Sequence, residues 1–213
     1  MDGRERLTVT VRGGTADRKP IVVRSISPGH QADGVIVPAL DIVDAIRSYA
    51  DQAVLAEVKS PFGLALERGL PLNDLLRDQP AEGEAVLRGL DETVRSAIDL
   101  ALGAGADGVF YVLDGAYPPA ASPMQYGGHY LEVDRAILSG IAEARLNILY
   151  VPGGPETYFD CLTDLSAHAI AWDLAASGVA VEQMRAMRPG ALAAADSAAD
   201  ILLLERFEDA ELL

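Results

Sequence analysis

The sequence predicts an α/β fold, a reduced (β/α) TIM-type barrel with about seven parallel strands. Short apolar segments alternate with helical segments along the whole chain, a pattern typical of a parallel sheet with crossover helices. Polar residues follow directly after several apolar segments, as they do at the carboxyl edge of such sheets, where ligands bind. A closed barrel of this type takes about 250 residues, whereas this chain has 213 and no long linker. We therefore expect one domain over residues 1–213 and an incomplete barrel.

The first third of the chain supplies three expected strands, over residues 21–26, 34–37 and 53–58. Each is an apolar run that ends at a turn-forming or polar residue. Asp41 can cap a helix between the second and third strands. Residues 7–11 alternate apolar and polar side chains, which favours a strand by propensity.

The longest helix is expected over residues 81–102, where apolar residues recur at helical spacing. Gly103 and Gly105 are expected to end it. The later strands are expected over residues 108–113, 147–151, 167–172 and 191–195, with helices at 155–165 and 179–187. Residues 201–207 are interpreted as a last amphipathic segment and not as a strand.

The stretch from Gly103 to Gly154 is the centre of this pattern. It contains a strand, a polar loop, a helix and a second strand, which together form a βαβ unit. The loop is rich in Pro and Gly and carries Tyr117, Tyr126 and His129. We expect the ligand site at this edge of the sheet.

The composition and charge narrow the choice of partners. The net charge is −15, with 32 acidic against 17 basic residues, which argues against nucleic acid because phosphate binding needs clustered Lys and Arg. No window approaches about 18 uninterrupted apolar residues, so we expect no membrane partner. Cys161 is the single cysteine, which excludes an intrachain disulfide, and we expect it to be a small buried hydrophobe. With no signal-peptide pattern at the start, the cytoplasm is the expected compartment.

Five short motifs follow one another along the chain. They are Arg4-Glu5-Arg6, the turn Asp17-Arg18-Lys19-Pro20, the loop Lys59-Ser60-Pro61-Phe62-Gly63-Leu64-Ala65, the strand Gly103–Asp114 and the strand His168–Asp173. Together they resemble the uroporphyrinogen decarboxylase superfamily, which also contains zinc-dependent corrinoid methyltransferases. In that family the first motif lies on a helix and the second leads into the first barrel strand.

The resemblance implies a barrel whose N-terminal segment, residues 7–11, is helical. It implies a lyase, such as a carboxy-lyase of porphyrin biosynthesis, or a methyl-transfer protein. The expected ligand is a small organic acid or a tetrapyrrole-related compound bound at the carboxyl face of the barrel.

The chain also departs from the family pattern. It is shorter, with one gap between Ser27 and Asp33 and no counterpart of the eighth strand after Ser197. Tyr150 and Pro152 stand where zinc-dependent members place His and Cys, and neither supplies a soft ligand for zinc. From these departures we expect no metal and no other cofactor. The alternative function is a non-catalytic binding or accessory protein that kept the fold and lost the chemistry.

Three residues are the catalytic candidates. Lys59 ends a strand, where it can form a Schiff base, bind a ligand or simply be solvated or ion-paired. Asp114 and His129 share the central loop, as an acid–base pair, as metal ligands together with Asp173, or as members of a hydrogen-bonded loop. No HxxxH or CxxC spacing supports the metal.

The ligand-binding candidates lie at expected strand ends and in the loops that follow them. They are His30, Ser60, Phe62, Tyr117, Tyr126, Gly153 and Asp173. His30 fits a satisfied loop histidine equally well, and Gly153 could offer backbone N–H groups to an anion. His168 begins a strand at the opposite edge, so we interpret it as structural.

The expected partners are a small-molecule ligand and a second copy of the chain. An unclosed barrel leaves strand edges exposed, and covering them favours a homodimer.

Overall fold

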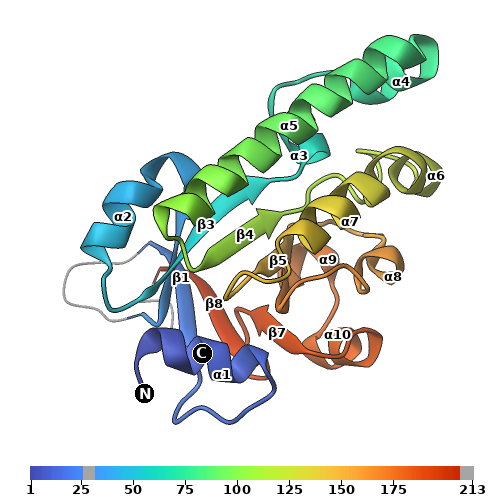
Figure 1. Cartoon of the computed structure of the whole chain (residues 1–213). Coiled ribbons are helices and arrows are strands. Elements are labelled where there is room, and N and C mark those ends of the chain that lie inside the picture. The colour runs from blue at the N-terminus through green and yellow to red at the C-terminus, as the bar shows by residue number, and fades with distance from the viewer. Residues whose placement is uncertain (26–31, 207–213) are drawn as a thin grey trace.

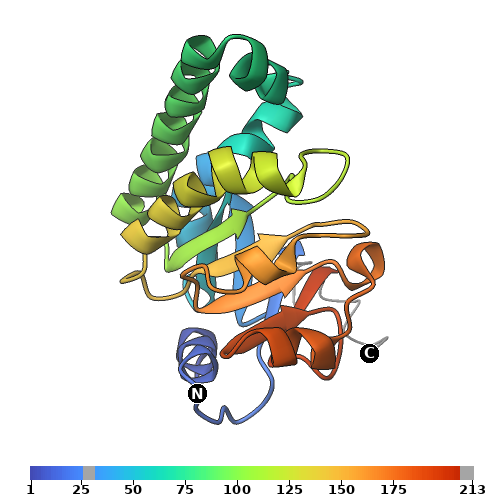
Figure 2. The same cartoon turned by 90° about the vertical axis from the view of Figure 1, so that its right-hand side faces the viewer.

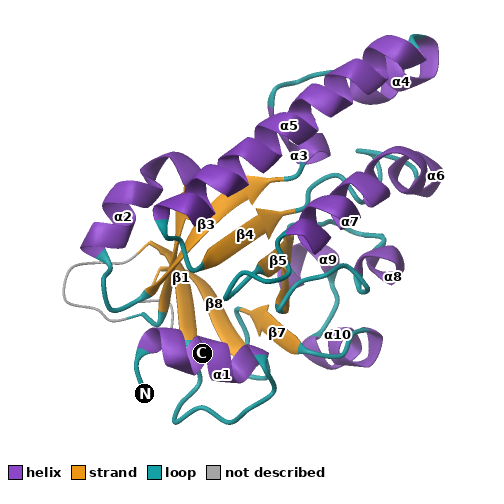
Figure 3. Ribbon diagram, viewed as in Figure 1, coloured by secondary structure: helices purple, strands orange, loops and turns teal. Residues whose placement is uncertain are grey.

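The structure, a computed structural model, describes residues 1–25 and 32–206. A closed barrel of parallel strands in sequential order, β1 to β8, forms its centre (Figure 3, orange). The strands are β1 (Ile21–Ser25), β2 (Gly34–Pro38), β3 (Ala53–Lys59), β4 (Gly108–Val112), β5 (Ile148–Val151), β6 (Ala169–Trp172), β7 (Ala191–Ala194) and β8 (Ile201–Arg206). The predicted α/β barrel is thus confirmed.

Helices surround the barrel on its outside (Figure 1). They are α1 (Gly3–Val11), η1 (Ala39–Asp41), α2 (Ile42–Ser48), α3 (Pro61–Glu67), α4 (Leu72–Asp78), α5 (Pro80–Ala104), α6 (Pro123–Gln125), the π-helix η2 (Tyr126–Tyr130), α7 (Leu131–Gly140), α8 (Phe159–Leu162), α9 (Leu174–Ser177) and α10 (Val181–Met187). Figures 1 and 2 show α4 and the start of α5 standing out from the barrel as a pair. Among the described residues, no helix combines the length and the apolar character needed to cross a membrane.

The expectation of about seven strands and an incomplete barrel was wrong, because an eighth strand, β8, closes the barrel. It pairs with β7 on one side and β1 on the other, with Ile21 opposite Leu202 and Ala193 opposite Ile201. Its four apolar residues, Ile201–Leu204, are followed by the charged Glu205 and Arg206, and so short a run also fits one face of a helix. The interpretation of residues 201–207 as an amphipathic segment and not a strand is therefore wrong. The closed barrel also removes the exposed edges on which the expected homodimer was based, so the dimer stays a prediction without that support.

The N-terminal segment is helical, as the family resemblance implied and against its strand propensity. Asp2 caps α1 by accepting a hydrogen bond from the Glu5 N–H at 2.8 Å. Leu7 is completely buried and packs inside the amino-terminal end of the barrel with Val22 and Ile36. Burial of this apolar side chain outweighs the weak intrinsic preference for a strand.

Two buried aspartates fasten α1 to the bottom of the barrel. Asp33, at the start of β2, accepts hydrogen bonds from Arg6, from the Arg18 guanidinium at 2.7 and 2.9 Å, and from the Ile21 N–H at 2.8 Å. Asp107, before β4, pairs with Arg4 Nε at 3.0 Å and also accepts from the Val54 N–H. The helix therefore crosses the bottom of the barrel and connects β1 and β2 with β3 and β4.

A third buried carboxylate anchors the segment between β4 and α7. Asp134 is 1% exposed and accepts hydrogen bonds from the hydroxyls of Tyr111 at 2.6 Å and Tyr126 at 2.7 Å. Burial raises the pKa of Asp134 to about 6, although the two hydroxyl donors offset part of that effect. Tyr111 belongs to β4 and Tyr126 begins η2, so this one side chain links three elements.

We predict that Asp33→Asn lowers the free energy of unfolding by about 3 kcal/mol, because two arginines then lose a buried anionic partner. Urea denaturation measures this loss. The control is Asp44→Asn. The Asp44 side chain is 91% exposed, and its Oδ1 lies 3.9 Å from Nη1 of Arg47. This control substitution should cost less than about 0.5 kcal/mol. Equal small losses in the two variants would show that Asp33 does not hold α1 in place.

We also predict a distinct pH dependence of stability from Asp134. The folded chain holds this proton more tightly than the unfolded chain, so the stabilising contribution is full below about pH 4 and is lost as the pH rises to about 6. Asp134→Asn cannot titrate. Its stability relative to the native protein should therefore rise by roughly 2 to 3 kcal/mol between pH 4 and pH 7.

Chemical denaturation at a series of pH values gives the free energy of unfolding of both proteins. In the difference between the two proteins, the contributions of the other carboxylates cancel. Glu132→Gln on the same helix alters an exposed carboxylate and should run parallel to the native protein. A parallel curve for Asp134→Asn as well would contradict the prediction.

Candidate functional site

Polar side chains gather inside the barrel at its carboxyl end. Val22, Leu55 and Ile148 point into the apolar interior, and successive residues of a strand alternate between its faces. The residues two positions further on therefore point inward too, one layer nearer the mouth. These residues are Arg24 on β1, Glu57 on β3 and Tyr150 on β5.

Arg24 is the centre of this layer. Its guanidinium donates a hydrogen bond to Glu57, and its Nε lies 3.4 Å from a carboxylate oxygen of Glu205 on β8. The guanidinium carbon lies 4.9 Å from the ring centre of Phe110 and 5.3 Å from that of Tyr150. These two rings stack with centres 5.2 Å apart. Carboxylates and aromatic rings from four strands thus hold one arginine in a fixed orientation.

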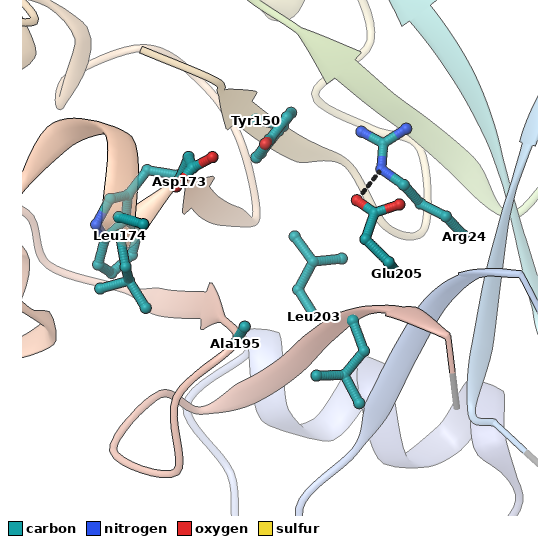
Figure 4. A pocket seen from close by; sticks show the side chains of 10 residues that line it. Arg24, Tyr150, Asp173, Leu174, Ala195, Leu203 and Glu205 are labelled. Atoms are coloured by element: carbon teal, nitrogen blue, oxygen red, sulfur yellow. Dashed lines mark ion pairs between the residues drawn. The ribbon is translucent and has the colours of Figure 1, made fainter. Parts of the chain in front are cut away.

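A pocket of about 320 Å³ opens beside Arg24 (Figure 4). Its lining comes from strand ends and from α9: Arg24, Tyr150, Trp172, Asp173, Leu174, Ala175, Ala195, Leu203, Leu204 and Glu205. The hollow lies on the side of β6 to β8 because β6 and β7 contribute only alanines to the interior, at positions 169, 171, 191 and 193. These small side chains leave space next to β6 and β7. Next to β4 and β5, the rings of Phe110 and Tyr150 fill the corresponding part of the interior.

Tyr150 and Asp173 supply the polar groups of the pocket opposite Arg24. Burial raises the pKa of Tyr150, and the carboxylate of Asp173 adds to that effect, so the phenol keeps its proton at neutral pH. Asp173 caps α9 through one carboxylate oxygen, which accepts a hydrogen bond from the Ala176 N–H at 2.9 Å. Of the ligand-binding candidates, Asp173 lines this pocket.

Lys59 stands apart from the mouth of the barrel. Its ammonium pairs with Glu67 of α3, and the side chain is 36% exposed. It borders a second hollow, of about 440 Å³, between the ends of β2 and β3 and the helices α3 and α5. The structure thus shows the ion-paired alternative, with Glu67 as the partner.

Asp114 and Tyr117 lie in the loop after β4. One carboxylate oxygen of Asp114 accepts a hydrogen bond from the Gly115 N–H at 2.7 Å. Burial, and then the charge of Asp114, raise the pKa of Tyr117. The Tyr117 ring packs on Gly154, in the loop after β5. These residues join two neighbouring loops.

Gly153 has a positive φ of 63°, and an added Cβ would lie 2.7 Å from the Thr157 hydroxyl. The same hydroxyl accepts the Gly154 N–H at 2.9 Å. That donor is therefore already used within the turn and does not face an anion.

Three further ligand-binding candidates are used by the fold itself. Ser60 is completely buried and caps α3 by accepting the Gly63 N–H at 3.1 Å. Phe62 stacks on Tyr130 with ring centres 3.9 Å apart. The hydroxyl of Tyr126 is bonded to Asp134. All of them pack against helices outside the barrel strands.

The remaining predicted residues have separate places. His129 is exposed on η2, with its ring 6.0 Å from that of Tyr130. Over residues 1–25 and 32–206, no hydrogen bond or ion pair joins Lys59, Asp114 and His129 to one another. His30 lies outside the described residues. His168 is structural, as expected: its Nδ1 accepts the Asn147 N–H at 2.9 Å.

Sequence reasoning missed Arg24, Glu57 and Glu205 as site residues. The available signal was a charged residue inside an otherwise apolar strand. Burying a charge costs free energy unless it is paired, and such exceptions are found at functional sites. The sequence marks Tyr150 only as a replacement for a metal ligand of the family. In the part of the chain that the structure describes, no three His, Cys, Asp or Glu side chains are placed so that they could hold a metal ion.

Comparisons with known proteins establish the fold and no family. Neither a protein-family model nor a curated protein matches the sequence. Among solved structures, a methyltransferase from Methanosarcina mazei superposes with a TM-score of 0.77, at 10% identity over 97% of this chain and 93% of that chain. A protein assigned as a deoxyribose-phosphate aldolase from Coccidioides immitis gives a TM-score of 0.52, at 9% identity over 100% and 96%. Both are similar to this chain in fold.

Proposed function

We propose that this protein is an enzyme of the lyase or methyl-transfer type that acts on a small organic acid in the pocket beside Arg24. The fold supports an enzyme, because structures with a similar fold are described as a methyltransferase and an aldolase. In such barrels the active site lies at the carboxyl end of the strands. The pocket of this chain is at that end.

The environment of Arg24 is the observation that carries the proposal. A guanidinium presents donors in a planar fork that matches a carboxylate. Here the guanidinium lies over the Phe110 and Tyr150 rings and donates to Glu57, but its other partner Glu205 is 76% exposed and 3.4 Å from Nε. That distance exceeds the 2.7–2.9 Å, roughly, of a good charge-assisted hydrogen bond. A ligand carboxylate can therefore displace Glu205 at small cost and form a shorter contact.

Tyr150 and Asp173 have properties that suit acid–base chemistry. When a lyase breaks a carbon–carbon bond, one fragment leaves as CO2 or a carbonyl compound, and the carbon of the other fragment keeps the electron pair and takes up a proton. The Tyr150 phenol, which is protonated at neutral pH, can supply that proton and regain it from water. Asp173 has a second carboxylate oxygen that can accept a hydrogen bond from the substrate.

The charges of the pocket favour a small acid over a tetrapyrrole. Its charged lining residues are Arg24, Asp173 and Glu205, one cation against two anions. A tetrapyrrole with many carboxylates would meet more repulsion than attraction there. A single carboxylate is the number that one guanidinium can pair with, and a small acid fits the volume of about 320 Å³.

A panel of small mono- and dicarboxylic acids tests this proposal. Ligands that bind the folded state raise the melting temperature by mass action, and calorimetric titration then gives Kd. We expect Arg24→Met to weaken binding roughly tenfold to a hundredfold, and Arg24→Lys to weaken it less because it keeps the charge. Arg47→Met, on an exposed helix surface, should bind like the native protein.

Binding and turnover together distinguish the proposed enzyme from the alternative, a non-catalytic binding or accessory protein. Product formation from a bound acid, followed by NMR, supports the enzyme. Binding that depends on Arg24 without any turnover would favour the non-catalytic alternative, which is motivated by the separate places of Lys59, Asp114 and His129. Acids that bind Arg24→Met as tightly as the native protein would contradict the site itself.

A further inference from the structure

The pocket beside Arg24 presents opposite charges on its two sides. Arg24 and Glu205 come from the neighbouring strands β1 and β8. Asp173 follows β6, on the far side of the pocket, and Tyr150 lies between them (Figure 4). A ligand in this pocket therefore meets a guanidinium at one end and a carboxylate at the other.

The carboxylate of Asp173 is only partly used by the protein. One oxygen accepts the Ala176 N–H as the cap of α9. Within the described residues, no ion pair or side-chain donor engages the other oxygen. Figure 4 shows the carboxylate directed across the pocket toward Tyr150. A carboxylate oxygen in this position can accept a hydrogen bond from a positively charged donor group.

Binding a simple acid would leave this charge unbalanced. A ligand carboxylate on Arg24 adds a negative charge to a pocket that already holds Asp173 and Glu205. A simple amine would balance those carboxylates but would face Arg24. A zwitterion satisfies both ends, and its small apolar part can contact Ala195 and Leu203.

We propose that the preferred ligands of this pocket are aminocarboxylates, with the carboxylate on Arg24 and the ammonium group on Asp173. This inference rests on the proposed function and narrows the small organic acid to one that also carries a cationic amine. Tyr150 lies between Arg24 and Asp173, so its side chain lies beside the middle of a ligand that spans these two residues. Glu205 moves into solvent when the ligand carboxylate takes its place on Arg24.

Titration with matched probes tests the inference. The probes are the standard L-amino acids, and each that binds is compared with its deaminated acid and its decarboxylated amine, for example leucine with isocaproate and isoamylamine. We expect the amino acid to bind at least about tenfold more tightly than either matched compound, because each of these lacks one ion pair.

Asp173→Asn is the decisive variant. Asparagine caps helices as well as aspartate does, so α9 keeps its cap and the fold is retained. Affinity for the amino acid should fall roughly tenfold, while affinity for the deaminated acid stays unchanged or rises. Glu205→Gln is the matched control in the same pocket. It removes the competitor for Arg24 and should strengthen the binding of amino acid and deaminated acid alike.

The outcomes distinguish this inference from the proposed function. If deaminated acids bind through Arg24 as tightly as amino acids do, or if Asp173→Asn weakens both equally, the inference is wrong and the proposed function stands. If neither class of compound binds in a way that depends on Arg24, both are wrong.

Discussion

The ion pairs of Asp33 with Arg6 and Arg18 are the constraint on which this barrel depends. Asp33 is almost completely buried, and an unpaired charge there would cost several kcal/mol. The pairs hold α1 across the amino-terminal end of the barrel, where Leu7 completes the apolar interior. Because this end is closed by apolar packing and paired charges, the opposite end is free to carry polar side chains and a cavity.

Because side chains alternate between the two faces of a strand, every second residue points into the barrel, and these inward residues differ between its two ends. Inward positions are apolar near α1 and become charged or aromatic one layer further on, at Arg24, Glu57 and Tyr150. The alanines of β6 and β7 then decide where the space lies. The same packing that stabilises the barrel therefore places a cavity next to an arginine whose orientation is fixed.

Most of the barrel could be predicted from the sequence, because buried parallel strands form apolar runs bounded by Gly, Pro or Asp. β8 could not, since its four apolar residues continue into Glu205 and Arg206 with no Gly, Pro or Asp to end the run, and so short a run fits a helix equally well. The candidate site was harder still. Asp173 was predictable because it directly follows a strand, whereas Arg24 meets Glu57 and Glu205 only through closure of the barrel. Phe62 and Tyr126 lie in segments typical of sites, but packing against helices takes up their rings, and that packing is not visible in the sequence.

The central claim is that the Arg24 guanidinium binds the carboxylate of a small ligand at the mouth of the barrel. The most direct measurement is the NMR signal of the Arg24 Nε–H group, assigned with Arg24→Met, during titration with small carboxylates and amino acids. We expect a saturable shift of this signal, with further shifts confined to residues around the pocket, such as Tyr150 and Asp173. An Arg24 signal that stays fixed while the ligand saturates the protein would contradict the claim.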